Sequence, residues 1–118
     1  MTEAETGTGA ERRHHDRVAK ALPVHVHRER SPESFPGEIV NIGAGGVLLR
    51  TSLPIGTNDL VSIDLDIDGE QDPIYVYGTV VRNDARGFGV SFVRISEVTA
   101  DLISYLIRKW QRDGAPAA

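Results

Sequence analysis

The chain has 118 residues, which is enough for one domain with a hydrophobic core and too few for two. Its hydrophobic content is 40%, which is ordinary for a folded domain. Its formal net charge is -4, which disfavours duplex nucleic acid as a partner. Cysteine is absent, which excludes disulfides, thiolate metal sites and cysteine nucleophiles. No apolar run approaches the ~20 residues that cross a bilayer, so we predict a cytoplasmic protein without membrane insertion.

The N-terminal segment divides into a tail and a basic arm. Residues 1–11 are mostly Thr, Glu, Gly and Ala, which cannot bury enough surface to offset the cost of ordering, so a disordered tail is predicted. Residues 12–21 are rich in Arg, Lys and His, in contrast to the acidic middle of the chain. Such an arm can hold a compact anion even though the whole chain is acidic.

A β-barrel is predicted over residues 22–94. Six strand-like segments follow one another, separated by turns that contain Gly or Pro. The clearest is residues 61–67, in which apolar and polar side chains alternate with period two. The fold class is therefore all-β, a six-stranded antiparallel meander that closes on itself as a barrel and hides its edges. The segments are 22–27, 38–42, 47–52, 61–67, 74–82 and 88–92.

A C-terminal helix is predicted over residues 96–111. Ser96 is a suitable N-cap, and Gly114 and Pro116 stop the helix. The apolar stripe is wide and must pack on another element, most simply the open mouth of the barrel. Its predicted members are Val98, Leu102, Tyr105, Leu106 and Lys109, widened by Ile103, Ile107 and Trp110.

The sequence predicts neither a metal site nor catalytic machinery. The Asp-x-Asp-x-Asp-Gly run at 64–69 begins like a calcium loop, but the twelfth position is Tyr75 instead of glutamate. His25 and His27 share a strand face without a third ligand. A Gly-x-Ser-x-Gly elbow and an acid–base carboxylate pair are both missing, so the protein is not predicted to be an enzyme.

Two short motifs rise above this background. Residues 13–17 read Arg-x-x-x-Arg, and residues 41–46 read Asn-x-Gly-x-x-Gly between two predicted strands. In this order they resemble the PilZ family, whose members bind the bacterial second messenger cyclic di-GMP. That family shows Arg-x-x-x-Arg before the barrel and Asp/Asn-x-Ser-x-x-Gly on it. The resemblance covers about residues 11–110, and residues 87–92 are similar to the family's closing strand.

The resemblance implies a single PilZ-like domain over residues 12–112 with cyclic di-GMP as its ligand. Arginine suits this ligand because its planar fork pairs with phosphate or with guanine O6 and N7. Asn41 can meet a base edge, and glycines let the backbone approach the ligand. Gly43 departs from the family's usual serine and removes one hydroxyl. The implied ligand-binding residues are Arg12, Arg13, Arg17, Asn41, Gly43, Gly45 and Gly46.

Three functions are compatible with these residues. The first is a cyclic di-GMP receptor that relays the signal to a protein partner by changing its surface. The second is a PilZ-like adaptor that has lost ligand binding, which Gly43 favours and the arginine pair disfavours. The third is a barrel that binds RNA or single strands, which the basic arm favours. The net charge opposes it, as does the expected lack of exposed aromatic side chains on the strands.

Overall fold

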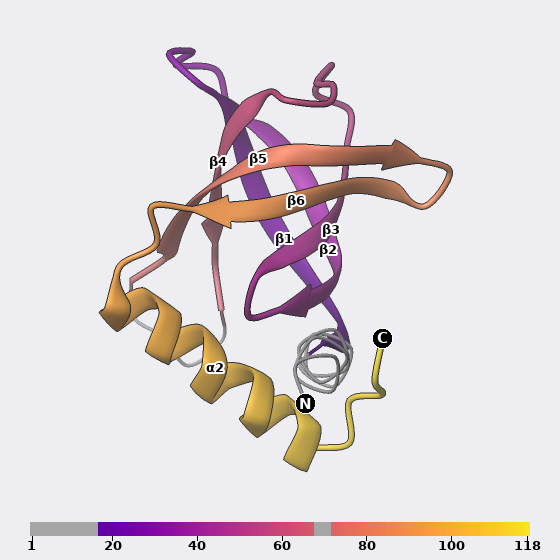
Figure 1. The fold of residues 1–118 in the computed structure, drawn as a ribbon, viewed down its shortest axis with the longest axis vertical. Coiled ribbons are helices and arrows are strands. Elements are labelled where there is room, and N and C mark those ends of the chain that lie inside the picture. Colours follow the sequence, from indigo (N-terminus) through magenta and orange to yellow (C-terminus); the bar gives the residue numbers. More distant parts are fainter. Residues whose placement is uncertain (1–16, 68–71) are drawn as a thin grey trace, which may run out of the picture.

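The computed structural model describes residues 17–67 and 72–118, and six antiparallel strands form a closed barrel followed by one helix (Figure 1). This architecture confirms the predicted fold class. Arg12, Arg13 and the predicted tail lie outside the described residues. The elements are β1 (Val18–Arg28), β2 (Phe35–Gly43), β3 (Gly46–Thr51), β4 (Leu60–Leu65), β5 (Ile74–Asp84), β6 (Gly87–Val93) and α2 (Glu97–Arg112).

The order of the strands around the barrel differs from the predicted simple meander. The order is β1-β2-β3-β6-β5-β4, so β3 pairs with β6, and β4 returns to pair with β1. The connection at residues 52–59 makes this crossover possible because it carries its own core side chains, Leu53 and Ile55. Its end is fixed by two backbone hydrogen bonds: Asn58 N–H donates to the Val80 carbonyl at 2.7 Å, and Val80 N–H donates to the Asp59 carbonyl at 2.9 Å.

The core consists of the inward-facing side chains of all six strands. β4 follows the predicted alternation, since Val61, Ile63 and Leu65 are buried whereas Ser62 and Asp64 are half-buried. No polar or charged side chain is buried within residues 17–67 and 72–118. The barrel is therefore closed around an apolar interior, and any polar ligand must bind on its outside.

Register shifts interrupt three of the strand pairs. β1 has an extra residue against β2 between Ala19 and Leu22. β2 has one against β3 at Val40, and β5 has one against β6 at Val81. A β-bulge of this kind bends the strand and changes which face the following side chain occupies. The bulges matter here because they set the orientation of the polar residues discussed below.

The helix α2 crosses one end of the barrel (Figure 1). Ser96 caps it, because its Oγ accepts a hydrogen bond from the Thr99 backbone N–H at 3.1 Å. The buried face consists of Ile103, Leu106, Ile107 and Trp110, which join the barrel's own core. This spacing of three and four residues is one helical face. Among the described residues, no helix is long and apolar enough to span a membrane.

The predicted stripe of the helix was partly wrong. Val98 is 79% exposed and Tyr105 is 48% exposed, and Lys109 is exposed as well. The stripe through these residues runs beside the buried face and points away from the barrel. A helix that lies on a barrel end buries only one face. The predicted stripe was too wide because it included exposed residues beside that face.

The chain after α2 returns to the start of β1. Ala19 N–H donates to the Pro116 carbonyl at 2.8 Å, and Ala118 N–H donates to the Arg17 carbonyl at 3.2 Å. The Lys20 ammonium also lies 5.5 Å from the centre of the Trp110 ring, a cation–π distance. The C-terminal segment and α2 are thus attached to the part of β1 next to Arg17.

We expect Leu106→Ala to lower the free energy of unfolding by about 2–5 kcal/mol, because Leu106 is 2% exposed within the shared core. Urea titration followed by circular dichroism measures the loss. Val98→Ala is the matched control on the exposed side of the same helix and should change stability by under about 0.5 kcal/mol. Equal stability of the two variants would mean that α2 does not hold the barrel end.

Candidate functional site

A cavity of about 490 Å³ lies beside the turn between β2 and β3. Its walls come from the residue before β1, this turn, the end of β5 and the middle of β6. Four residues implied by the resemblance meet here, namely Arg17 and the three glycines of the turn. The residues that line the cavity are Arg17, Gly43, Ala44, Gly45, Gly46, Val47, Val81, Arg82, Gly89, Val90 and Ser91.

Arg17 is held at the cavity by Asn41. The Arg17 guanidinium donates from Nε at 3.2 Å and from Nη2 at 2.5 Å to Asn41 Oδ1. Both side chains are half-buried, and the bulge at Val40 leaves Asn41 outside the core, between buried Ile39 and buried Ile42. Asn41 therefore orients Arg17, and its contact with a base edge stays a prediction.

The electrostatics of the cavity favour an anion. Burial lowers the pKa of the Arg17 guanidinium, and the positive charges of Arg82 and Arg86 lower this pKa further. None of the described residues that line the cavity is acidic. Asp84 stands outside, 3.8 Å from Arg82 Nε and 4.0 Å from Arg86 Nε in exposed positions. An anion between the guanidiniums would relieve their repulsion without facing a carboxylate on these walls.

The glycines of the turn have different physical roles. A Cβ on Gly46 would lie 2.1 Å from the Val90 carbonyl oxygen, so glycine is required there for β3 to approach β6. A Cβ on Gly45 would meet nothing within 4 Å. Gly43 is buried and is not among the described glycines with positive φ, which are Gly87 and Gly114. Its backbone conformation is therefore open to the serine that the family usually has.

Sequence reasoning missed the contribution of β5 and β6 to this cavity. Arg82 and Ser91 line it, although neither belongs to the two motifs. Continued alternation after buried Val80 would have sent Arg82 into the core, and the bulge at Val81 that prevents this leaves no clear sequence signal. Gly89 was the available signal, because a glycine inside a strand often marks a close approach.

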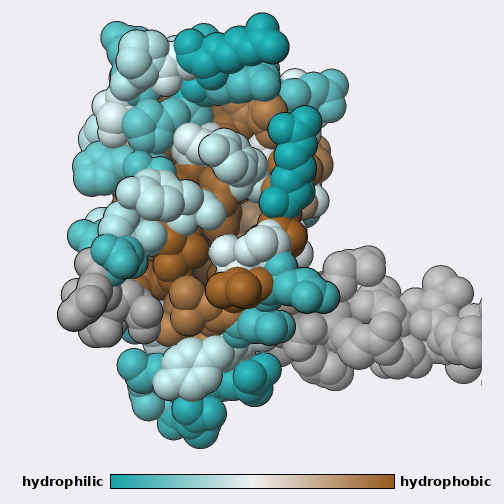
Figure 2. All heavy atoms as spheres, turned by 90° about the vertical axis from the view of Figure 1, so that its left-hand side faces the viewer, coloured by the Kyte–Doolittle hydropathy of each residue, from teal (hydrophilic) through white to brown (hydrophobic). Residues whose placement is uncertain are grey.

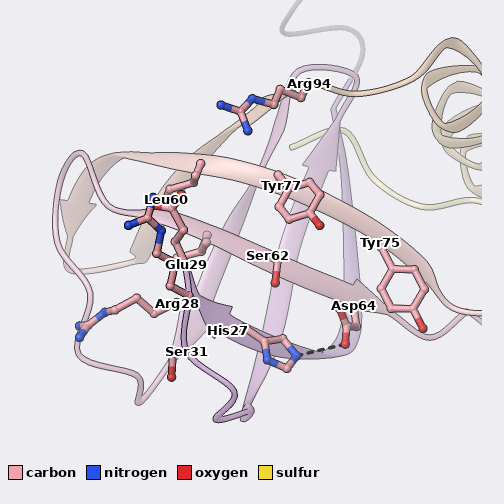
Figure 3. A pocket seen from close by; sticks show the side chains of 12 residues that line it. His27, Arg28, Glu29, Ser31, Leu60, Ser62, Asp64, Tyr75, Tyr77 and Arg94 are labelled. Carbon is pink, nitrogen blue, oxygen red and sulfur yellow. Dashed lines mark hydrogen bonds and ion pairs between the residues drawn. The ribbon is translucent and has the colours of Figure 1, made fainter.

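A second hollow of about 500 Å³ crosses the outer face of β1, β4 and β5 (Figure 3). Tyr75 and Tyr77 line it together, 62% and 54% exposed, so the expectation that the strands lack an exposed aromatic cluster was wrong. They are exposed because they alternate with the core residues Ile74 and Val76, a pattern already visible in the sequence. The full lining is His27, Arg28, Glu29, Arg30, Ser31, Leu60, Val61, Ser62, Asp64, Tyr75, Tyr77 and Arg94.

Unlike the first cavity, this second hollow has carboxylates as well as arginines in its lining, and the carboxylates oppose the binding of a dianion there. Asp64 and Glu29 line it, and the Asp64 carboxylate lies 3.3 Å from His27 Nε2. His25, the other histidine of the pair noted in the sequence, is exposed on the same strand. Within the described residues, no group of three or more His, Asp or Glu side chains is arranged to hold a metal ion.

Comparison with known proteins gives a family and two solved structures. The PilZ domain family model matches residues 11–109. The crystal structure of the PilZ domain of CeSA from a cellulose-synthesizing bacterium is 19% identical with a TM-score of 0.62, covering 80% of this chain and 97% of that chain. The Bacillus subtilis inhibitor of motility MotI/DgrA is 17% identical with a TM-score of 0.66, covering 83% and 50%. No curated protein sequence matches the chain.

Proposed function

The chain belongs to the PilZ domain family, and from this premise we propose that it is a cyclic di-GMP receptor whose ligand binds in the cavity beside the β2–β3 turn. One observation carries the proposal. The Arg17 guanidinium is fixed by Asn41 at the wall of a cavity that also contains Arg82. The protein thus binds and responds to a ligand, and the proposal includes no catalytic step.

The chemistry of the cavity fits the two parts of cyclic di-GMP. Its phosphates are anionic acceptors, and its guanines offer O6 and N7 to the planar fork of an arginine. The exposed glycine at position 45 leaves one side of the cavity open to a flat ligand. Good bidentate contacts contribute about 1–3 kcal/mol each, so three of them near the upper end match the roughly 8 kcal/mol of micromolar affinity for a preorganised ligand. Arg12 and Arg13, which precede the described residues, would add to these contacts.

A ligand-specific rise in melting temperature tests the proposal. Ligand at about 100 times its dissociation constant stabilises the bound state by about 2.7 kcal/mol, which is a shift of several degrees for a domain of this size. Cyclic di-AMP and GMP are the controls. Cyclic di-AMP keeps the cyclic dianion and changes the bases, whereas GMP keeps the guanine and lacks the cyclic dinucleotide. A shift with cyclic di-GMP alone supports the receptor, and equal shifts with all three ligands contradict it.

We extend the proposal to a cytoplasmic relay by protein contact. The C-terminal segment is bonded to the Arg17 carbonyl, and Lys20 lies over Trp110 of α2, so a movement of the arm on ligand binding reaches the helix. The outer face of α2 carries exposed Val98 and Tyr105. Such a face suits a partner that distinguishes the free and bound states.

The alternative function is an adaptor that acts by protein contact without the ligand. Exposed Tyr75 and Tyr77 favour it, because tyrosine is enriched where binding energy concentrates in protein interfaces. On the face drawn in Figure 2, apolar side chains gather between polar regions at both ends. Gly43 also favours the adaptor, because it removes a hydroxyl from the turn that the ligand would meet.

We predict that Gly43→Ser tightens cyclic di-GMP binding by a few-fold to about tenfold, because one hydrogen bond contributes about 0.5–1.5 kcal/mol. The backbone at this position does not have positive φ, so the backbone conformation itself does not oppose the gain. Calorimetric dissociation constants of the two proteins measure it, with melting curves as the control for stability. If neither protein binds the ligand, the adaptor is the better account.

A further inference from the structure

The bulge at Val81 determines where Arg82 lies. Val80 pairs with Val90, and Arg82 pairs with Gly89, so Val81 is an extra residue on β5. Val80 is fully buried, and both residues after it are exposed. Strict alternation would place the residue after Val81 on the core side. The bulge therefore keeps a charged side chain out of the apolar core and on the wall of the cavity.

Gly89 provides the space in which the Arg82 side chain rests. A Cβ on Gly89 would lie 3.1 Å from both Nε and Nη2 of Arg82, and 3.2 Å from its Cβ. The Arg82 guanidinium therefore lies over the β6 backbone, at the spot that a larger residue would occupy. The Gly89 backbone is itself buried under this side chain, and both residues line the cavity.

Arg82 and Arg17 both line the cavity and act on each other there. Arg82 belongs to β5 and Arg17 directly precedes β1, and the charge of Arg82 lowers the pKa of Arg17. The ion pair of Arg82 with Asp84 is long, at 3.8 Å, and both side chains are largely exposed. Such a pair contributes little and leaves the guanidinium available to a ligand.

We propose that Arg82 is a ligand-contacting residue of this site, outside the two sequence motifs, and that Gly89 leaves the space in which the Arg82 side chain lies. Arg82 supplies a second guanidinium to the cavity that Arg17 lines, for an acceptor on the phosphate or guanine of cyclic di-GMP. It adds a charged donor to a site in which Gly43 lacks a hydroxyl. This inference rests on the proposed receptor function.

Calorimetric titration of Arg82→Ala with cyclic di-GMP tests the contact. We expect affinity to fall about tenfold to a hundredfold, as for a lost hydrogen bond from a charged group. Arg86→Ala is the matched control, since Arg86 also acts on Arg17 but is not among the described lining residues. It should change affinity by under about threefold at physiological salt. Equal losses in both variants would mean a general charge effect and would overturn the contact.

The role of Gly89 is tested by the Gly89→Ala substitution in two backgrounds, the parent protein and Arg82→Ala. In the parent protein the new methyl group makes the Arg82 guanidinium shift by a few tenths of an ångström from its place over β6, so affinity should fall, by less than in Arg82→Ala. In the Arg82→Ala background the same change should have no further effect. An equal loss of affinity in that background would show that the methyl group blocks the ligand directly. It would overturn the claim that Gly89 acts by making room for Arg82. Melting curves confirm that each variant is folded.

The inference and the receptor function can fail separately. Arg82→Ala that binds like the parent, while Arg17→Ala loses binding, overturns the role of Arg82 and leaves the receptor standing. Absence of binding by the parent protein overturns both. Arg82→Lys should recover only part of the affinity, because lysine keeps the charge and lacks the planar fork.

Discussion

Gly46→Ala is expected to cost about 3 kcal/mol or more of folding free energy, and it is the substitution in this turn with the largest effect on stability. The new Cβ would lie 2.1 Å from the Val90 carbonyl oxygen and 3.2 Å from Ser91 Cα, which are backbone atoms that no side-chain rotation can move. β3 would have to separate from β6, where Gly46 pairs with Ser91. Chemical denaturation of the two proteins measures the cost.

Gly45→Ala is the matched control for this substitution in the same turn. Its Cβ meets nothing within 4 Å, and its φ is not in the positive region, so stability should change by under about 0.5 kcal/mol or rise slightly. The comparison separates two roles that the motif does not distinguish. If both variants were equally stable, the close approach of β3 to β6 would not be the reason for glycine at position 46.

Arg17→Ala is expected to weaken cyclic di-GMP binding at least about a hundredfold. Arg17 provides the half-buried guanidinium that Asn41 already orients, so its loss removes a preorganised charged donor and leaves Asn41 Oδ1 without it. The fold should persist, because the Arg17 side chain is not part of the apolar core. Calorimetry gives the affinity, and circular dichroism gives the fold.

Arg50→Ala is the matched control for Arg17→Ala. Arg50 is an exposed arginine of β3 whose Nε donates to the Arg86 carbonyl at 2.9 Å, and it does not appear among the described residues of the cavity. Its removal changes the net charge equally and should leave affinity within about threefold. An Arg17→Ala protein that binds as tightly as Arg50→Ala would contradict the position of the site.

The sequence was sufficient for the class of the fold because burial on one face of a strand imposes period two. Val61, Ile63 and Leu65 carried this signal in β4, and Ser96 marked the start of the helix. The strand order was not predictable in the same way, because pairing between β3 and β6 depends on contacts far apart in sequence. Among the described residues, the local feature that accompanies this pairing is the connection between β3 and β4, in which Leu53 and Ile55 are buried.

The candidate site was predictable only as far as its motifs extend. Arg17, Asn41 and the turn glycines stand at spacings that a resemblance can match. Arg82 could not be found this way, because a single extra residue at Val81 decides whether it faces the core or the cavity. The exposed tyrosines of β5 were overlooked although the alternation of Ile74 and Val76 already indicated them. Bulges are the part of the site that local sequence does not specify.

The most direct test of the central claim is a calorimetric titration of the unmodified protein with cyclic di-GMP at physiological salt. We predict saturable binding with a dissociation constant on the order of micromolar, as expected from a few bidentate arginine contacts to a preorganised ligand. The binding heat at the same concentrations should be much smaller for Arg17→Ala than for the parent protein. A parent titration without heat, at concentrations that would detect ~100 μM affinity and with no shift in melting temperature, would contradict the account.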